Sequence, residues 1–163
     1  MRLLAAATAL VTALLAGAPA AAALDVGAND DMARYQDDRG AAMFAQMREL
    51  GLTQVVIGVR HTPSDPLAIP GRESLAEAVQ TATAAGLRVV LALYPYPPRE
   101  IEAGVGTPAL FAAFVAEVAA AFPEDRQFVI GNEPNQPAFW RPQFDASGAN
   151  VSAAAFGAYL AAA

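Results

Sequence analysis

The sequence predicts an α/β fold in which short buried strands alternate with amphipathic helices. Four short, almost continuously apolar runs have the composition of parallel strands that are covered on both faces. Segments with apolar residues at helical spacing separate these runs. Such alternation is typical of a parallel sheet with right-handed crossovers. The predicted strands are residues 24–27, 54–59, 88–93 and 127–130.

A start or stop signal marks each helix expected between the strands. Acidic or hydroxyl side chains precede two of the helices and can accept hydrogen bonds from their first backbone N–H groups. Glycine or proline follows each helix and ends it. The expected helices run from Asp38 to Gly51, from Ser74 to Gly86 and from Thr107 to Pro123, and a fourth begins near Ser152.

Two parallel-sheet arrangements fit this pattern, a doubly wound sheet and a (β/α) barrel. No glycine-rich nucleotide-binding turn follows any predicted strand, and Gly104-Val105-Gly106 precedes a helix without following a strand, so the barrel is favoured. A (β/α)8 TIM barrel needs roughly 250 residues. Because only about four βα units fit into this chain, we expect residues 24–163 to be the N-terminal half of a larger, truncated barrel domain.

The first 23 residues have the pattern of a secretory signal peptide. Arg2 is followed by an apolar stretch from Leu3 to Leu15 and then by small residues suited to cleavage. The apolar stretch is shorter than the roughly 20 residues that a membrane span needs, although a retained N-terminal anchor is the alternative. We therefore expect a secreted protein that is free of the membrane after cleavage.

Composition excludes several classes of function. The formal net charge is −6, and the ten basic residues are all arginines without a basic cluster, which argues against a nucleic-acid partner. Cysteine is absent, so the fold must depend on a hydrophobic core. The single histidine, His61, excludes a histidine-rich metal site but not calcium bound by carboxylates, and we expect no metal or other cofactor. Composition leaves the oligomeric state open.

The tripeptide Asn132-Glu133-Pro134 follows the fourth predicted strand after a single glycine, Gly131. Pro134 lacks a backbone N–H group and favours an extended conformation at Glu133, so the strand must end here. The Glu133 carboxyl group is then expected at the C-terminal end of the sheet, where α/β folds usually place their chemistry. The alternative is that the tripeptide only forms a turn.

Asn-Glu-Pro at this position resembles the acid/base motif of clan A glycoside hydrolases, retaining TIM-barrel enzymes that include cellulases and xylosidases. The resemblance implies hydrolysis of O-glycosyl bonds in a β-linked oligo- or polysaccharide, with Glu133 as general acid/base and Asn132 bound to the sugar 2-hydroxyl. It implies a glutamate nucleophile on a seventh strand, so we expect the 163-residue chain alone to be inactive. The alternative is a non-catalytic carbohydrate-binding module or an inactive fragment.

Three further residues near predicted strand ends are candidates for substrate binding. Arg60 closes the second strand and resembles the clan arginine that orients the nucleophile, although a rim ion pair is the alternative. Tyr94 and Trp140 follow the third and fourth strands and offer aromatic faces to sugar rings, although either could cover the core instead. Many clan members have a histidine where this chain has Tyr94.

Other polar residues near the strand ends have simpler interpretations. Asn29, Asp30 and Asp31 follow the first strand, and adjacent acidic residues before a helix act more often as turn and cap residues than as ligands. His61 follows Arg60 and is interpreted as a plain surface or turn residue, although a place beside Arg60 at the strand ends is the alternative.

Overall fold

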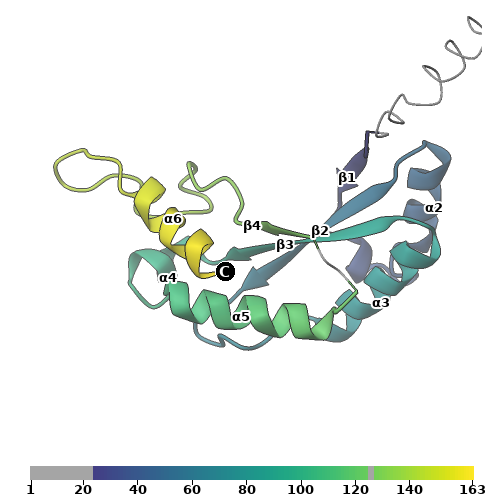
Figure 1. Ribbon diagram of the computed structural model, residues 1–163, viewed down its shortest axis with the longest axis horizontal. Coiled ribbons are helices and arrows are strands. Elements are labelled where there is room, and N and C mark those ends of the chain that lie inside the picture. Colours follow the sequence, from purple (N-terminus) through teal and green to yellow (C-terminus); the bar gives the residue numbers. More distant parts are fainter. Residues whose placement is uncertain (1–23, 125–126) are drawn as a thin grey trace, which may run out of the picture.

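The computed structural model describes residues 24–124 and 127–163 of the chain. The predicted signal peptide, residues 1–23, lies outside the described residues. The described chain forms a four-stranded parallel sheet in the order β1-β2-β3-β4 (Figure 1). This confirms the predicted α/β alternation. The strands are β1 (Gly27–Asn29), β2 (Gln54–His61), β3 (Arg88–Pro95) and β4 (Phe128–Ile130).

Helices connect the consecutive strands, and those expected from the sequence are present within a few residues. The sequence did not predict η1 and α4, because both are shorter than the span over which helical periodicity can be recognised. No helix among the described residues is long and apolar enough to cross a membrane. The helices are η1 (Ala33–Tyr35), α2 (Ala41–Glu49), α3 (Arg72–Ala84), α4 (Pro98–Glu102), α5 (Pro108–Ala121) and α6 (Ser152–Ala162).

Side chains hold the starts of two helices, as the sequence predicts. The Asp38 carboxylate accepts hydrogen bonds from the backbone N–H groups of Ala42 (3.0 Å) and Gly40 (2.9 Å), and these bonds lower the pKa of Asp38. The Thr107 hydroxyl accepts a bond from the Leu110 N–H group at 3.2 Å. These bonds satisfy N–H groups that have no partner inside the helix.

The first strand differs from the prediction, since β1 spans Gly27–Asn29 rather than residues 24–27. Pairing with β2 decides this position, because Gly27 lies opposite Gln54 and Asn29 lies opposite Val56. The apolar side chains of Leu24 and Val26, which suggested an earlier strand, are exposed.

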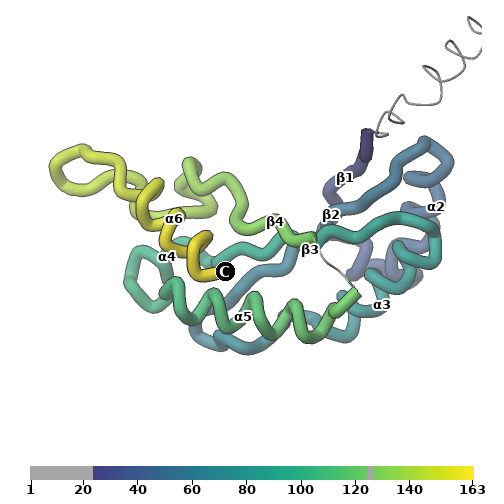
Figure 2. Tube along the Cα trace, viewed as in Figure 1, coloured from purple at the N-terminus to yellow at the C-terminus, as the bar shows by residue number. Residues whose placement is uncertain are grey.

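The two faces of the sheet differ because side chains alternate along each strand. Odd-numbered side chains of β2 and β3, from Val55 to His61 and from Val89 to Leu93, are buried in the core against α3 and α5. Figures 1 and 2 show α2, α3 and α5 on this one side of the sheet. In the part of the chain that the structure describes, no helix covers the opposite face, where Val129 is exposed (Figure 1).

The strand order runs without reversal. A doubly wound sheet reverses its order and carries helices on both faces, so the described chain does not have that arrangement. The sheet is compatible with partial βα repeats. Because the strands are parallel, their C-terminal ends lie along one edge, together with the loops that follow them.

Candidate functional site

A cavity of about 230 Å³ lies at the C-terminal edge of the sheet. Gly58 pairs with Ala92 and Arg60 pairs with Tyr94, so these four residues share one face of β2 and β3. The small residues Gly58 and Ala92 leave space beneath the two large side chains. The residues that line this cavity are Asn29, Asp31, Gly58, Arg60, Ala92, Tyr94, Asn132 and Phe139.

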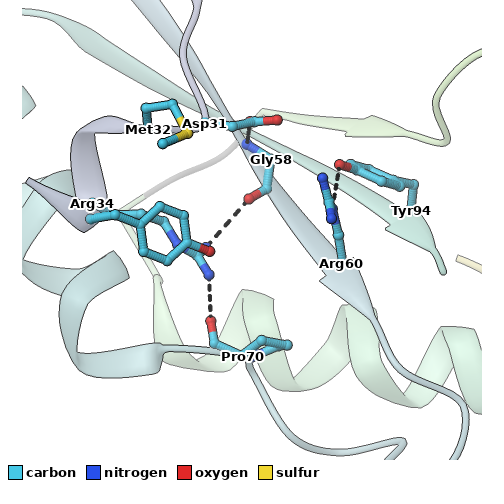
Figure 3. A pocket seen from close by; sticks show the side chains of 8 residues that line it. Asp31, Met32, Arg34, Gly58, Arg60, Pro70 and Tyr94 are labelled. Atoms are coloured by element: carbon cyan, nitrogen blue, oxygen red, sulfur yellow. Dashed lines mark hydrogen bonds between the residues drawn. The ribbon is translucent and has the colours of Figure 1, made fainter. Parts of the chain in front are cut away.

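Two tyrosines hold the Arg60 guanidinium group in position. Its Nε atom donates a hydrogen bond to the Tyr94 hydroxyl at 3.1 Å (Figure 3). The guanidinium carbon lies 4.8 Å from the centre of the Tyr96 ring, which is a favourable distance for a cation–π contact. The hydrogen bond to Tyr94 raises the pKa of Arg60. The cavity therefore contains a permanently charged group with a defined orientation.

The segment after β1 is held to β2 by two adjacent aspartates. Asp30 Oδ1 accepts hydrogen bonds from the N–H groups of Met32 (2.6 Å) and Ala33 (2.9 Å), which confirms its predicted role as a turn and cap residue. Asp31 Oδ1 accepts a bond from the Gly58 N–H group at 2.7 Å. A Cβ atom at Gly58 would lie 2.5 Å from the same oxygen, so the bond requires glycine. Asp31 is thus both a structural residue and part of the cavity wall.

The chain leaves the sheet through Gly131 and enters a tight turn. The Gly131 N–H group donates to the Leu93 carbonyl oxygen at 2.7 Å, and Gly131 has a φ angle of 86°. Asn132 then lines the cavity. Glu133 is exposed and is not among the lining residues.

The conformation of Glu133 differs from the extended one predicted before proline. Its φ angle is 40°, which is uncommon for a residue other than glycine. The Glu133 carbonyl oxygen accepts a hydrogen bond from the Gln136 N–H group at 2.8 Å, so Glu133 is the first residue of a turn. Such strained residues persist where the surrounding structure holds them, and they cluster at functional sites.

Trp140 does not lie in the cavity that was predicted for it. Its side chain is 2% exposed, and its ring centre is 4.9 Å from that of Tyr159 and 5.7 Å from that of Phe156, both in α6. An indole that is enclosed in this way has no free face for a sugar ring. The structure corrects this prediction and places Trp140 in the core.

The aromatic residue that the same loop brings to the cavity is Phe139. Its ring meets the Tyr94 ring edge to face at 6.4 Å. The Gln143 side chain holds the loop by donating to the carbonyl oxygens of Trp140 (2.8 Å) and Pro134 (3.0 Å). Which of two neighbouring aromatic residues faces the cavity depends on this loop conformation, and no sequence periodicity indicates it.

The interpretation of His61 as a surface or turn residue is wrong. Its side chain is fully buried, with ring centres 5.0 Å from Phe114 and 5.7 Å from Phe111 in α5. Burial lowers its pKa to about 4. Side-chain alternation was the missed signal, because adjacent residues of a strand point to opposite faces and Arg60 faces the cavity.

The structure thus brings together three of the five predicted site residues: Arg60, Tyr94 and Asn132. Within residues 24–124 and 127–163, no group of three or more His, Asp or Glu residues could hold a metal ion. Comparisons of the chain with protein-family models, curated proteins and solved structures find no match.

Proposed function

We propose that this chain belongs to a secreted (β/α)-barrel glycoside hydrolase of the retaining type, with Glu133 as its general acid/base. One observation carries the proposal. Asn132 and Glu133 lie just beyond Gly131 after the fourth strand of a sequentially ordered parallel sheet, and Asn132 lines a cavity with residues from the ends of the three preceding strands. The uncovered sheet face and the unreversed strand order support the barrel, since a barrel encloses one face of its sheet.

In this mechanism, the Glu133 carboxylic acid donates its proton to the glycosidic oxygen as the bond to the anomeric carbon breaks. A second carboxylate, expected on a seventh strand, attacks the anomeric carbon and forms a glycosyl ester. The Glu133 carboxylate then removes a proton from water, which hydrolyses the ester and regenerates both carboxyl groups. The first sugar unit leaves as an alcohol, and the second is released with its anomeric configuration retained.

The cavity residues have complementary roles in the proposal. Asn132 hydrogen-bonds the sugar 2-hydroxyl, a contact that strengthens in the transition state. Arg60 presents a guanidinium group whose two terminal nitrogens suit a carboxylate, and Tyr94 and Tyr96 hold it in place. A charged group that is positioned before the substrate binds costs little to organise during the reaction.

A second candidate function is non-catalytic carbohydrate binding. It is favoured by the observation that Glu133 is exposed and does not line the cavity, whereas the binding candidates Asn132, Arg60 and Tyr94 do. If the reading frame continues beyond Ala163, a strand that ends in glutamate at the seventh position of the repeat favours the enzyme. A continuation without such a glutamate favours the binding module.

The decisive experiment is the Glu133→Gln substitution in the full-length protein, assayed on β-glycosides with good and poor leaving groups. Glutamine cannot donate the proton, so we expect turnover of unactivated disaccharides to fall roughly 10²–10⁴-fold. Formation of the glycosyl ester from dinitrophenyl glycosides should be nearly unchanged, because dinitrophenolate leaves without protonation.

The matched control is Glu117→Gln, because Glu117 is exposed on α5 and lies outside the cavity. It should leave both rates unchanged. An equal loss of rate on good and poor leaving groups in the Glu133→Gln variant would contradict the acid role. Tight glycan binding without any turnover in the wild type would instead support the binding module.

A further inference from the structure

A second cavity, of about 180 Å³, lies beside η1 and adjoins the first. The two cavities share Asp31, Gly58, Arg60 and Tyr94, so they lie side by side at the C-terminal edge of the sheet. Together their volumes reach the range of small-molecule sites, roughly 300–1,000 Å³. Neither cavity alone does so. Tyr35 lines only the second cavity, and Asn132 lines only the first.

Tyr35 is an exposed aromatic side chain, with 62% of its surface accessible to solvent, although it lines a cavity. The guanidinium carbon of Arg34 lies 4.9 Å from the centre of the Tyr35 ring. Arg34 is only 5% exposed. The ring therefore rests on a buried cation and remains open to solvent elsewhere.

Backbone carbonyl groups hold the Arg34 side chain. Its Nη2 atom donates to the Pro70 carbonyl oxygen at 2.8 Å, and its Nη1 atom donates to that of Gly58 at 3.4 Å (Figure 3). The hydrogen bonds of Asp30 and Asp31 fix the same segment from its N-terminal side. Because the support of the Tyr35 ring is already ordered, a ligand that stacks on the ring loses little affinity to ordering it.

The groups around this ring suit a pyranose better than a flat or wholly apolar ligand. Sugar rings have an apolar C–H face, which an aromatic ring can cover, and hydroxyl groups at their edges. The same cavity is lined by the Asp31 carboxylate, which can accept hydrogen bonds from hydroxyl groups, and by the Arg60 guanidinium group, which can donate to them. Small-molecule sites usually combine aromatic and other apolar side chains with a few polar groups that fix the orientation of the ligand.

From this arrangement we infer that Tyr35 forms a second sugar subsite, in which one pyranose unit of the glycan stacks on its ring. The identity of the ligand rests on the proposed function. The unit next to it along the glycan occupies the cavity of Arg60 and Asn132. Tyr35 and Arg34 had no place in the predicted site, because η1 is too short to be recognised in the sequence.

The test uses methyl-¹³C-methionine NMR of the full-length protein in the Glu133→Gln background, so that the ligand is not hydrolysed. Cellohexaose, xylohexaose and mannohexaose are titrated separately, together with their disaccharides. Met32 lines the same cavity as Tyr35, whereas Met47 is buried in the core and serves as an internal reference. We expect one hexasaccharide to shift the Met32 methyl resonance and to leave the Met47 resonance in place.

Substitutions of Tyr35 then test the stacking contact. Tyr35→Ala should weaken hexasaccharide binding about tenfold, the loss expected when a stacked aromatic ring is removed, and Tyr35→Phe should restore it. Phe144→Ala is the matched control, because Phe144 is an exposed aromatic residue outside both cavities. The Phe144→Ala variant should bind the hexasaccharide as tightly as the parent protein.

The inference is overturned if no hexasaccharide moves the Met32 resonance or if Tyr35→Ala binds as tightly as the parent. It is also overturned if Tyr35→Phe loses as much affinity as Tyr35→Ala. These outcomes are independent of hydrolysis. Tyr35-dependent binding without turnover in the wild type supports the subsite and removes the proposed enzymatic function. Turnover in the wild type without Tyr35-dependent binding supports the proposed enzymatic function and removes the subsite.

Discussion

Acidification should destabilise this protein through His61, and the structure gives the size of the effect. The pKa of His61 is lowered from 6.5 to about 4 because the folded protein buries the ring between Phe111 and Phe114. Between these two pH values the unfolded chain binds a proton that the folded chain does not, so the free energy of unfolding falls as the pH falls. At about 1.4 kcal/mol per pKa unit, the full loss is about 3 kcal/mol. This is a large part of the 5–15 kcal/mol typical of a folded domain.

The assay is urea denaturation at several pH values, followed by the fluorescence of Trp140, the only tryptophan in the chain. Trp140 is buried, so its emission reports unfolding. The variant His61→Leu keeps an apolar side chain in the core and cannot titrate. The low-pKa carboxylates of Asp38 and Asp145 are present in both proteins, so the difference between the two pH profiles isolates His61. Parallel profiles, or an NMR titration of folded His61 with a midpoint near 6.5, would refute the reasoning.

Two glycine substitutions test the local geometry around the site. Gly58→Ala should cost about 1–3 kcal/mol, because its Cβ atom would lie 2.5 Å from Asp31 Oδ1 and force the carboxylate away; urea denaturation measures the cost. Gly131→Ala should be destabilising for two reasons, its φ angle of 86° and the collision of a Cβ atom with the Phe156 ring. Gly51→Ala is its control, since Gly51 has a φ angle of 83° and no atom within 4 Å of an added Cβ. If Gly131→Ala and Gly51→Ala lower the free energy of unfolding equally, the contact with Phe156 contributes nothing.

Much of the fold could be predicted from local sequence patterns. The structure confirms two kinds of local signal: the apolar runs that form β2 and β3, and the side chains of Asp38 and Thr107 that bind N–H groups at the starts of helices. Each signal involves residues only a few positions apart in the chain. The position of β1 could not be predicted in this way. Its bounds follow from pairing with β2, which lies more than 20 residues further along the chain.

The candidate site was partly predictable because strand ends can be recognised from local sequence patterns. Arg60, Tyr94 and Asn132 stand at or just after strand ends, and parallel strands bring those ends to one edge. Phe139 was missed because it lies in a loop whose conformation depends on hydrogen bonds from Gln143. The acid/base role of Glu133 stays a prediction that the Glu133→Gln experiment tests.

Local patterns in the sequence were sufficient to establish the alternating strands and helices and to locate the tripeptide that follows β4. Periodicity, caps and stops act over a few residues, so they can be recognised without knowing the fold. The tertiary structure decided which side chains face which space. In the folded chain, Trp140 and His61 are buried, and the exposed Tyr35 ring packs on the side chain of Arg34. Glu133 has a positive φ angle. These features depend on contacts between segments that are distant in the chain or on loop hydrogen bonds, neither of which leaves a periodic pattern.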